Sequence, residues 1–180
     1  LSGSPSDNQL AGFGKRLIRF MALFRGWNYR SPMIEKMVNG PFEKPFMKEG
    51  IVNAWICSDR DVVEEYNKDP LCGVTFTLNG YYALFSLIQT VYSKLGWSKK
   101  NRDLPVMFVS GENDPCRQGD KAFKKAVLHF KHCGFPNTFS KVYKGMRHEV
   151  FNEKNASEVY EDILKFLEIK AGIEDIRYQD

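Results

Sequence analysis

The spacing of apolar and polar residues changes character about 100 residues into the chain. In the first part, apolar residues recur every three or four positions between stretches rich in proline and glycine, which is typical of amphipathic helices. Helices are predicted at residues 7–25, 31–38, 59–67 and 77–92. The last of these is so apolar that we expect it to be buried on more than one side. Ser58 is the expected N-cap of the third helix.

Beyond residue 103 the pattern predicts alternating strands and helices. Residues 106–109 are a continuous apolar run, as expected for a parallel strand covered on both faces. Residues 138–143 alternate as a strand, and helices are predicted at 118–133 and 156–170. Strand, helix, strand and helix with short connections predict a right-handed parallel crossover. The fold class is therefore α/β, preceded by a helical insertion that has no strand pattern of its own.

The first predicted helix carries an apolar stripe with a basic flank. The stripe consists of residues spaced three and four apart, namely Leu10, Phe13, Leu17, Phe20, Met21 and Phe24. The flank consists of Lys15, Arg16, Arg19 and Arg25. Two interpretations are open: a lid helix that lays its stripe over a pocket, or a face that makes transient contact with a membrane surface.

Composition narrows the class of protein. The 180 residues, 14% of them aromatic, suit one domain with a sizeable core, with or without an inserted subdomain. A net charge of +4 without clustering predicts no nucleic-acid partner. No apolar run approaches the length of a transmembrane helix, and no signal peptide is visible. The start of the chain, Leu1-Ser2-Gly3-Ser4, resembles the end of a strand already under way.

The cysteines predict free thiols in a reducing cytoplasm. They are widely spaced and form no paired motif of a zinc site or a disulfide scaffold: Cys57, Cys72, Cys116 and Cys133. His129 and His132 lie near Cys133, but their spacing in the predicted helix 118–133 places them on its surface. We therefore predict neither a metal nor another cofactor.

Each predicted strand leads into a loop with an ionisable residue near its start. Asp114 follows the first strand and His148 follows the second. Neighbouring parallel strands lie about 4.8 Å apart and end at the same edge of the sheet, so these side chains can meet. A carboxylate there would fix the imidazole tautomer and stabilise the imidazolium formed when histidine takes a proton from a nucleophile. The pair is a candidate acid and base.

Simpler interpretations stay open on spacing alone. Residues 112–115 would make an ordinary turn, and His148 could be a surface residue leading into the next helix. Glu112 and Glu149 are competing acids, but they point less naturally at the pairing and we expect them to be solvated. Residues 12–15 resemble part of a phosphate loop but lack a following Ser or Thr and a preceding strand, which favours a helix.

Together these segments resemble the monoacylglycerol lipase and lysophospholipase group of α/β-hydrolases, also described as serine aminopeptidase-like hydrolases. The resemblance rests on residues 39–46, 59–73, 109–115 and 145–153, and on the order of acid before histidine. It implies the C-terminal portion of an α/β-hydrolase fold with a helical cap. Residues 1–4 would end a core strand, residues 5–75 would form the cap, and residues 76–180 would complete the core.

The resemblance implies a serine hydrolase of carboxylic esters, of the lysophospholipase or monoacylglycerol lipase type, with a lipid-like acyl ester as substrate. Asp114 and His148 would be catalytic, and four residues of the first helix would line the acyl pocket: Leu17, Phe20, Met21 and Phe24. The nucleophilic serine sits on a Gly-x-Ser-x-Gly elbow in that family, and no such elbow is present, residues 3–6 included.

The chain alone is therefore expected to be inactive. We expect it to occur with the missing N-terminal half of the hydrolase or to self-associate. Three alternatives remain: a non-catalytic binding protein with a hydrolase-like fold, a peptidase or short-chain esterase on the same fold, and a flavodoxin-like domain. The flavodoxin-like alternative leaves the helical insertion unexplained.

Overall fold

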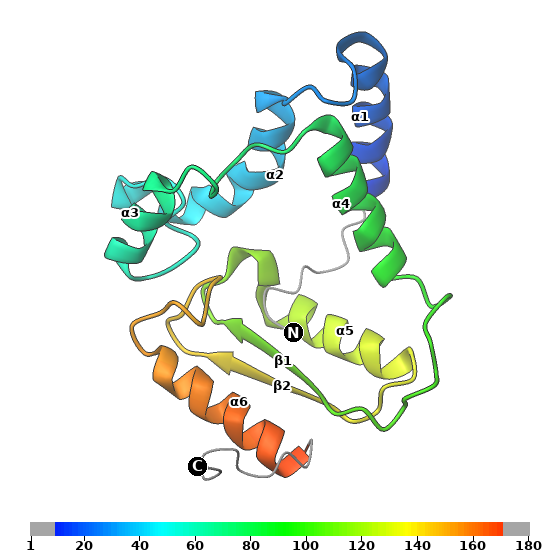
Figure 1. Cartoon of the computed structure of the whole chain (residues 1–180), viewed down its shortest axis with the longest axis vertical. Coiled ribbons are helices and arrows are strands. Elements are labelled where there is room, and N and C mark those ends of the chain that lie inside the picture. Colours follow the sequence, from blue (N-terminus) through cyan, green and yellow to red (C-terminus); the bar gives the residue numbers. More distant parts are fainter. Residues whose placement is uncertain (1–9, 171–180) are drawn as a thin grey trace, which may run out of the picture.

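The computed structural model describes residues 10–170. Its elements, in chain order, are α1 (Ala11–Arg25), α2 (Pro32–Glu43), the 3-10 helix η1 (Lys44–Glu49), α3 (Arg60–Lys68), α4 (Leu78–Val91), β1 (Val106–Gly111), the 3-10 helix η2 (Pro115–Arg117), α5 (Gly119–His132), β2 (Thr138–Tyr143) and α6 (Ala156–Lys170). Figure 1 shows an α/β layer of β1, β2, α5 and α6, with the helices α1 to α4 standing over one end of it. The strand end predicted at residues 1–4 lies outside the described residues.

The α/β layer has the predicted parallel arrangement. β1 and β2 pair in parallel, with Val106 opposite Thr138. Successive residues of a strand point to opposite faces, and β1 accordingly packs Phe108 against α5 and Val109 against α6. α5 makes the crossover between the strands (Figure 1). The α/β fold class is confirmed.

Helix α1 packs along α4, and two residues of its predicted apolar stripe, Leu17 and Met21, lie at the edge of the shared core. The buried residues of this shared core are Ala11, Ile18, Ala22, Ile34, Leu78, Tyr81 and Phe85. A Cβ at Gly14 would lie 2.5 Å from Cε2 of Phe85, so the aromatic ring occupies the space that a larger residue would need. The buried face of α1 thus combines Ile18 with smaller residues, and Phe13, Phe20 and Phe24 lie outside it and are exposed.

Three further expectations for the helical region change. α4 is buried on one side only, with Leu78 and Tyr81 in the core and Leu87 exposed. α2 extends beyond the predicted residue 38 and runs through Pro41 to Glu43. The N-cap of α3 is Asp59, whose side chain accepts a hydrogen bond from the backbone of Asp61, 3.1 Å away. Ser58 was the wrong choice because its hydroxyl is already bonded to Glu153.

Residues 51–58, which we call the docking segment, join η1 to α3. Ile56 and Cys57 of this segment are buried together with Val63 of α3. On its other side, the carbonyl oxygen of Ile56 accepts a hydrogen bond from the backbone of Glu149, 2.8 Å away. The docking segment therefore connects the helical region to the loop that follows β2.

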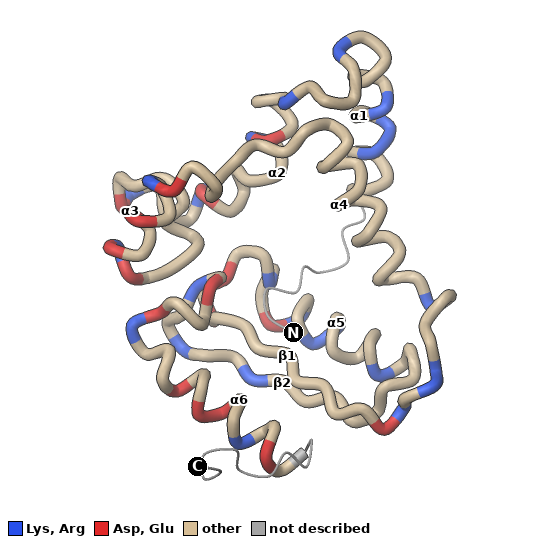
Figure 2. Tube along the Cα trace, viewed as in Figure 1, with Lys and Arg blue, Asp and Glu red and all other residues tan. Residues whose placement is uncertain are grey.

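No helix in the span 10–170 is both long enough and apolar enough to cross a bilayer. Charge is unevenly spread over the helical region. Lys and Arg line α1, whereas Asp and Glu gather around α3 (Figure 2).

Candidate active site

Asp114 is held by its own loop. It is the N-cap of η2, and its Oδ1 accepts a hydrogen bond from the backbone of Cys116, 2.8 Å away. Its Oδ2 accepts a longer bond of 3.4 Å from the hydroxyl of Ser110, the penultimate residue of β1. The side chain has no exposed surface. These partners lie within four residues of Asp114, so the local turn orients the carboxylate.

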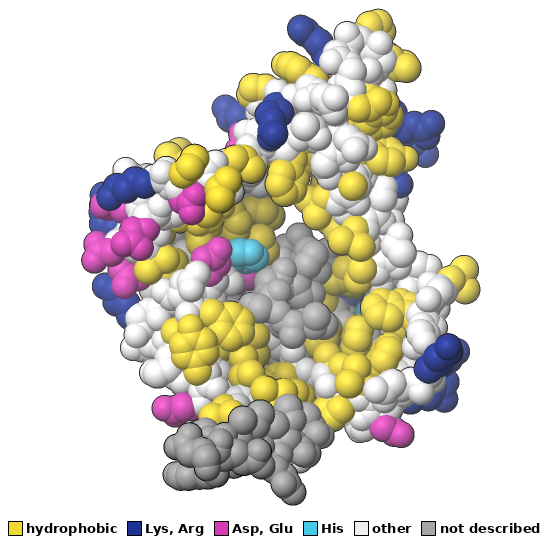
Figure 3. Space-filling view, in the orientation of Figure 1, with side chains coloured by type: hydrophobic (Ala, Val, Ile, Leu, Met, Phe, Trp, Pro, Cys, Tyr) yellow, Lys and Arg dark blue, Asp and Glu magenta, His cyan; other side chains and the backbone are white. Residues whose placement is uncertain are grey.

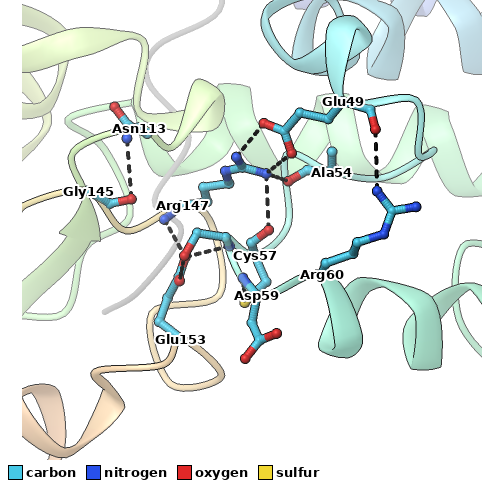
Figure 4. A network of polar contacts seen from close by, with 10 residues as sticks. Glu49, Ala54, Cys57, Asp59, Arg60, Asn113, Gly145, Arg147 and Glu153 are labelled. Carbon is cyan, nitrogen blue, oxygen red and sulfur yellow. Dashed lines mark hydrogen bonds and ion pairs between the residues drawn. The ribbon is translucent and has the colours of Figure 1, made fainter.

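The loop after β2 lies directly against the loop after β1. The backbone of Asn113 donates to the carbonyl oxygen of Met146 over 2.9 Å, and its side chain donates to the carbonyl oxygen of Gly145 (Figure 4). At Gly111 a Cβ would lie 2.1 Å from the carbonyl oxygen of Arg147. Only glycine lets the two loops approach this closely.

His148 and Asp114 meet between these loops. Nδ1 of His148 lies 3.1 Å from Oδ1 and 3.2 Å from Oδ2 of Asp114. The imidazole is 27% exposed, and the ring of Trp55 lies against it with centroids 5.0 Å apart. A bond through Nδ1 leaves Nε2 to exchange a proton with a nucleophile, which is the arrangement of acid and base in a catalytic triad.

The two competing acids bind elsewhere. The carboxylate of Glu112 accepts from the backbone of Gly145 at 3.0 Å, and that of Glu149 accepts from the side chain of Asn152 at 2.7 Å. Glu112 is exposed, as expected of a solvated acid, and Glu149 is half-buried. Asp114 is the carboxylate bonded to His148.

Ligand atoms of Asp114, Cys116 and His148 lie within 4.8 Å of one another, the separation a metal site would require. Burial and the neighbouring carboxylate of Asp114 raise the pKa of the Cys116 thiol, which favours the neutral thiol when no cation is bound. Elsewhere, Nε2 of His129 is near the carbonyl oxygen of Val91 and the sulfur of Cys133, and His132 joins no cluster of three ligand residues among the described residues. The bond between Asp114 and Nδ1 of His148 is an arrangement suited to proton transfer.

The four residues predicted to line an acyl pocket fall into two pairs. Leu17 and Met21 pack against the core shared by α1 and α4. Phe20 and Phe24 are exposed, with ring centroids 5.2 Å apart. The contacts described for these four residues do not include His148, and their role in binding an acyl chain stays a prediction.

Sequence reasoning missed three residues that surround the histidine loop. Trp55 lies against the imidazole, and Arg147 bonds to the docking segment. The buried Glu153 bonds both to the docking segment and to the backbone of Arg147. Arg147 and its partner Glu49 are 98 residues apart in the chain. No local pattern signals a contact of that range.

The chain has two parallel strands joined by a crossover helix, and a helical insertion precedes them. An acid follows the first strand and a histidine follows the second. This order defines the C-terminal portion of an α/β-hydrolase fold. The family described as serine aminopeptidase, S33, matches residues 11–155. The chain belongs to this family of hydrolases.

Solved structures agree on the fold. A thermostable carboxyl esterase from Bacillus coagulans, bound to glycerol, superposes with a TM-score of 0.81 at 21% identity, covering 94% of this chain and 56% of its own. A lipase in its open form superposes with a TM-score of 0.75 at 17% identity, covering 96% of this chain and 57% of the lipase. A monoglyceride lipase from Saccharomyces cerevisiae superposes with a TM-score of 0.53 at 18% identity, covering 86% of this chain and 58% of that lipase.

At these identities the likeness establishes the fold alone. The chain spans little more than half the length of these solved structures. No curated protein matches the sequence significantly.

Proposed function

We propose that the protein to which this chain belongs is a serine hydrolase of carboxylic esters, of the lysophospholipase or monoacylglycerol lipase type. The bond between Nδ1 of His148 and the buried carboxylate of Asp114 is the observation that carries the proposal. A serine upstream of this chain would attack the ester carbonyl. His148 would take the serine proton at Nε2 and then deliver it to the leaving alcohol, while Asp114 holds the tautomer and stabilises the imidazolium.

A lipid-like substrate is supported by the exposed face of α1. Phe13, Phe20, Leu23 and Phe24 are all largely exposed there. Figure 3 shows hydrophobic side chains at the surface of this end of the molecule, interspersed with Lys and Arg. An apolar face bordered by basic residues suits transient contact with an anionic lipid surface, from which an acyl ester could be drawn. Leu17 and Met21, beside this face, would then contact the acyl chain.

The absent partner would be the upstream half of the hydrolase fold. Among residues 10–170, the sheet consists of β1 and β2. An apolar groove of about 350 Å³ lies between β1 and α6, lined in part by Met107, Val109 and Phe166. Exposed apolar grooves favour association, so the chain would bind either its upstream half or a second copy. The chain alone would be inactive because its sequence contains no Gly-x-Ser-x-Gly elbow. The cysteines are free, which supports a cytoplasmic location.

The test is labelling with a fluorophosphonate, which reacts with activated serines. The protein carrying both halves of the fold should be labelled at one serine upstream of Leu1, and His148→Ala should abolish the reaction. Hydrolysis of long-chain and short-chain esters would then separate a lipase from a short-chain esterase, and a peptide substrate would reveal a peptidase. No labelling of a folded protein would contradict the proposal and favour a non-catalytic binding protein.

A further inference from the structure

The loop that carries His148 is anchored to the docking segment as well as to the sheet. The backbone of His148 donates to the carbonyl oxygen of Trp55 at 3.4 Å, and that of Glu149 donates to Ile56 at 2.8 Å. The indole ring of Trp55 also lies against the imidazole. The position of the base therefore depends on residues more than 90 positions earlier in the chain.

Glu153 also connects the loop that carries His148 to the docking segment. Its Oε1 accepts hydrogen bonds from the backbone of Ser58 at 3.0 Å and from the backbone of Arg147 at 2.7 Å (Figure 4). Its Oε2 accepts from the hydroxyl of Ser58. The residue is only 5% exposed. A buried carboxylate with three donors is well satisfied, and one of these donors belongs to the residue immediately before His148.

The side chain of Arg147 adds a third connection. Its guanidinium donates to the carbonyl oxygens of Ala54 and Cys57 in the docking segment, and forms an ion pair with Glu49 (Figure 4). It also stacks on the ring of Phe46, 4.3 Å from the centroid. Three consecutive residues, from Arg147 to Glu149, are thus bonded to the docking segment.

We propose that Glu153 and the docking segment are positioning elements for the catalytic histidine. Glu153 holds Ser58 and the backbone of Arg147 at a fixed separation, which sets where the imidazole stands relative to Asp114 and to the incoming nucleophile. Displacement of the docking segment would misalign the base. Misplacement of a catalytic group by about 1 Å costs on the order of 100-fold in rate. This inference deepens the proposed hydrolase function and rests on it.

The decisive variants differ in geometry at one position. Glu153→Ala removes all three bonds, whereas Glu153→Gln keeps an oxygen that can accept from both backbone donors. In the protein carrying the complete triad, we expect Glu153→Ala to lower kcat on a soluble short-chain ester by about 30- to 100-fold, with KM nearly unchanged. Glu153→Gln should restore most of the rate. Lys154→Ala, at an exposed neighbour, is the matched control.

A second readout does not depend on turnover. The proton on Nδ1 of His148, bonded to Asp114, should give a downfield proton NMR signal that is lost in Asp114→Ala. We expect the signal to persist in Glu153→Gln and to broaden or disappear in Glu153→Ala. Where Glu153→Ala does not fold, Ser58→Ala provides the same test, because it removes one bond from the docking segment and should lower kcat about 3- to 10-fold.

The two proposals can fail separately. An inactive wild-type protein that still shows the variant-dependent NMR signal would reject the hydrolase function and leave the positioning role intact. An active wild-type protein whose folded Glu153→Ala and Ser58→Ala variants keep both kcat and the NMR signal would overturn the positioning role. Loss of folding stability with unchanged kcat in the folded fraction would likewise show Glu153 to be structural.

Discussion

The loops that carry Asp114 and His148 meet at a distance of 3.1 Å, yet they are held in place by contacts of very different range. Asp114 is oriented by Cys116 and Ser110, which are two and four residues away. The loop of His148 is bonded to the docking segment, more than 90 residues earlier. The acid is thus fixed by local sequence, whereas the base depends on how a remote segment packs.

The largest expected effect tests the acid itself. Asp114→Asn preserves shape but removes the charge that stabilises an imidazolium, and it lets the wrong tautomer of His148 form. We expect kcat/KM for an ester to fall by about 10⁴-fold in the protein with the complete triad. The matched control is Glu112→Gln, at an exposed acid bonded to Gly145, which should cost less than about 3-fold. Equal effects of the two substitutions would mean that Asp114 is not the acid.

The next largest effect concerns the contact between the loops. Gly111→Ala would place a Cβ 2.1 Å from the carbonyl oxygen of Arg147 and 2.3 Å from that of Met146, and backbone atoms cannot move aside cheaply. We expect a loss of about 3–5 kcal/mol in the free energy of unfolding, measured by denaturant titration.

Gly145→Ala is the control for this substitution, because Gly145 has a positive φ of 74° but no atom within 4 Å of the added Cβ. It should cost only about 1–2 kcal/mol, the strain of a left-handed backbone. If Gly145→Ala proved the more damaging change, backbone conformation rather than close approach would dominate the junction of the loops.

A smaller effect tests the apolar support of the docking segment. Ile56 is fully enclosed with Cys57 and Val63, and its carbonyl oxygen binds the loop of His148. Ile56→Ala should destabilise the protein by about 2–4 kcal/mol and should also lower kcat, since the segment loosens where it holds the base. Val52→Ala, at an exposed residue of the same segment, should change neither quantity. A stability loss without any change in kcat would weaken the link between this core and the base.

The same difference in range explains what the sequence could predict. The apolar run at Val106–Val109 and the alternation at Thr138–Tyr143 are local patterns, and both strands occur where expected. The pairing of Asp114 with His148 followed from strand ends meeting at one edge of a parallel sheet. In contrast, Glu153 contacts Ser58 and Arg147 contacts Glu49 across long stretches of chain. The spacing of apolar and polar residues cannot predict contacts between such distant segments.

Helix α1 shows a different limit. The predicted apolar stripe divides in the structure: Leu17 and Met21 pack against the core, whereas its phenylalanines are exposed. The buried residues of the helix include Gly14 and Ile18, which the stripe did not contain. Large and small residues both recur at helical spacing on this helix, and the choice between them depends on the partner. The ring of Phe85 on α4 needs a gap, and Gly14 provides it. A glycine at helical spacing can mark a close contact with a neighbouring helix. Here that contact could be recognised only once Phe85 of α4 was known to lie beside Gly14.

The substitution with the smallest expected effect tests whether contacts within the α/β layer also hold His148 in place. Lys141 of β2 pairs with Asp162 and Glu158 of α6, on side chains that are partly exposed. The hydrogen bond from Lys141 lowers the pKa of Asp162, and the bond to Asp162 raises the pKa of Lys141. Exposed pairs of this kind contribute less than about 1 kcal/mol, so Lys141→Met should destabilise the protein only slightly at pH 7.

The pH dependence of that small difference follows from the directions of the shifts. Because the pKa of Asp162 is lowered in the folded protein, its contribution is present above its ordinary pKa of 3.8 and is lost as the pH falls through the lowered value. On the alkaline side, the contribution of Lys141 is lost as the pH rises through its raised pKa. Denaturant titrations of wild type and Lys141→Met should therefore converge at both extremes. A loss of kcat as large as that of Glu153→Ala would show that β2 and α6, rather than the docking segment, hold the histidine in place.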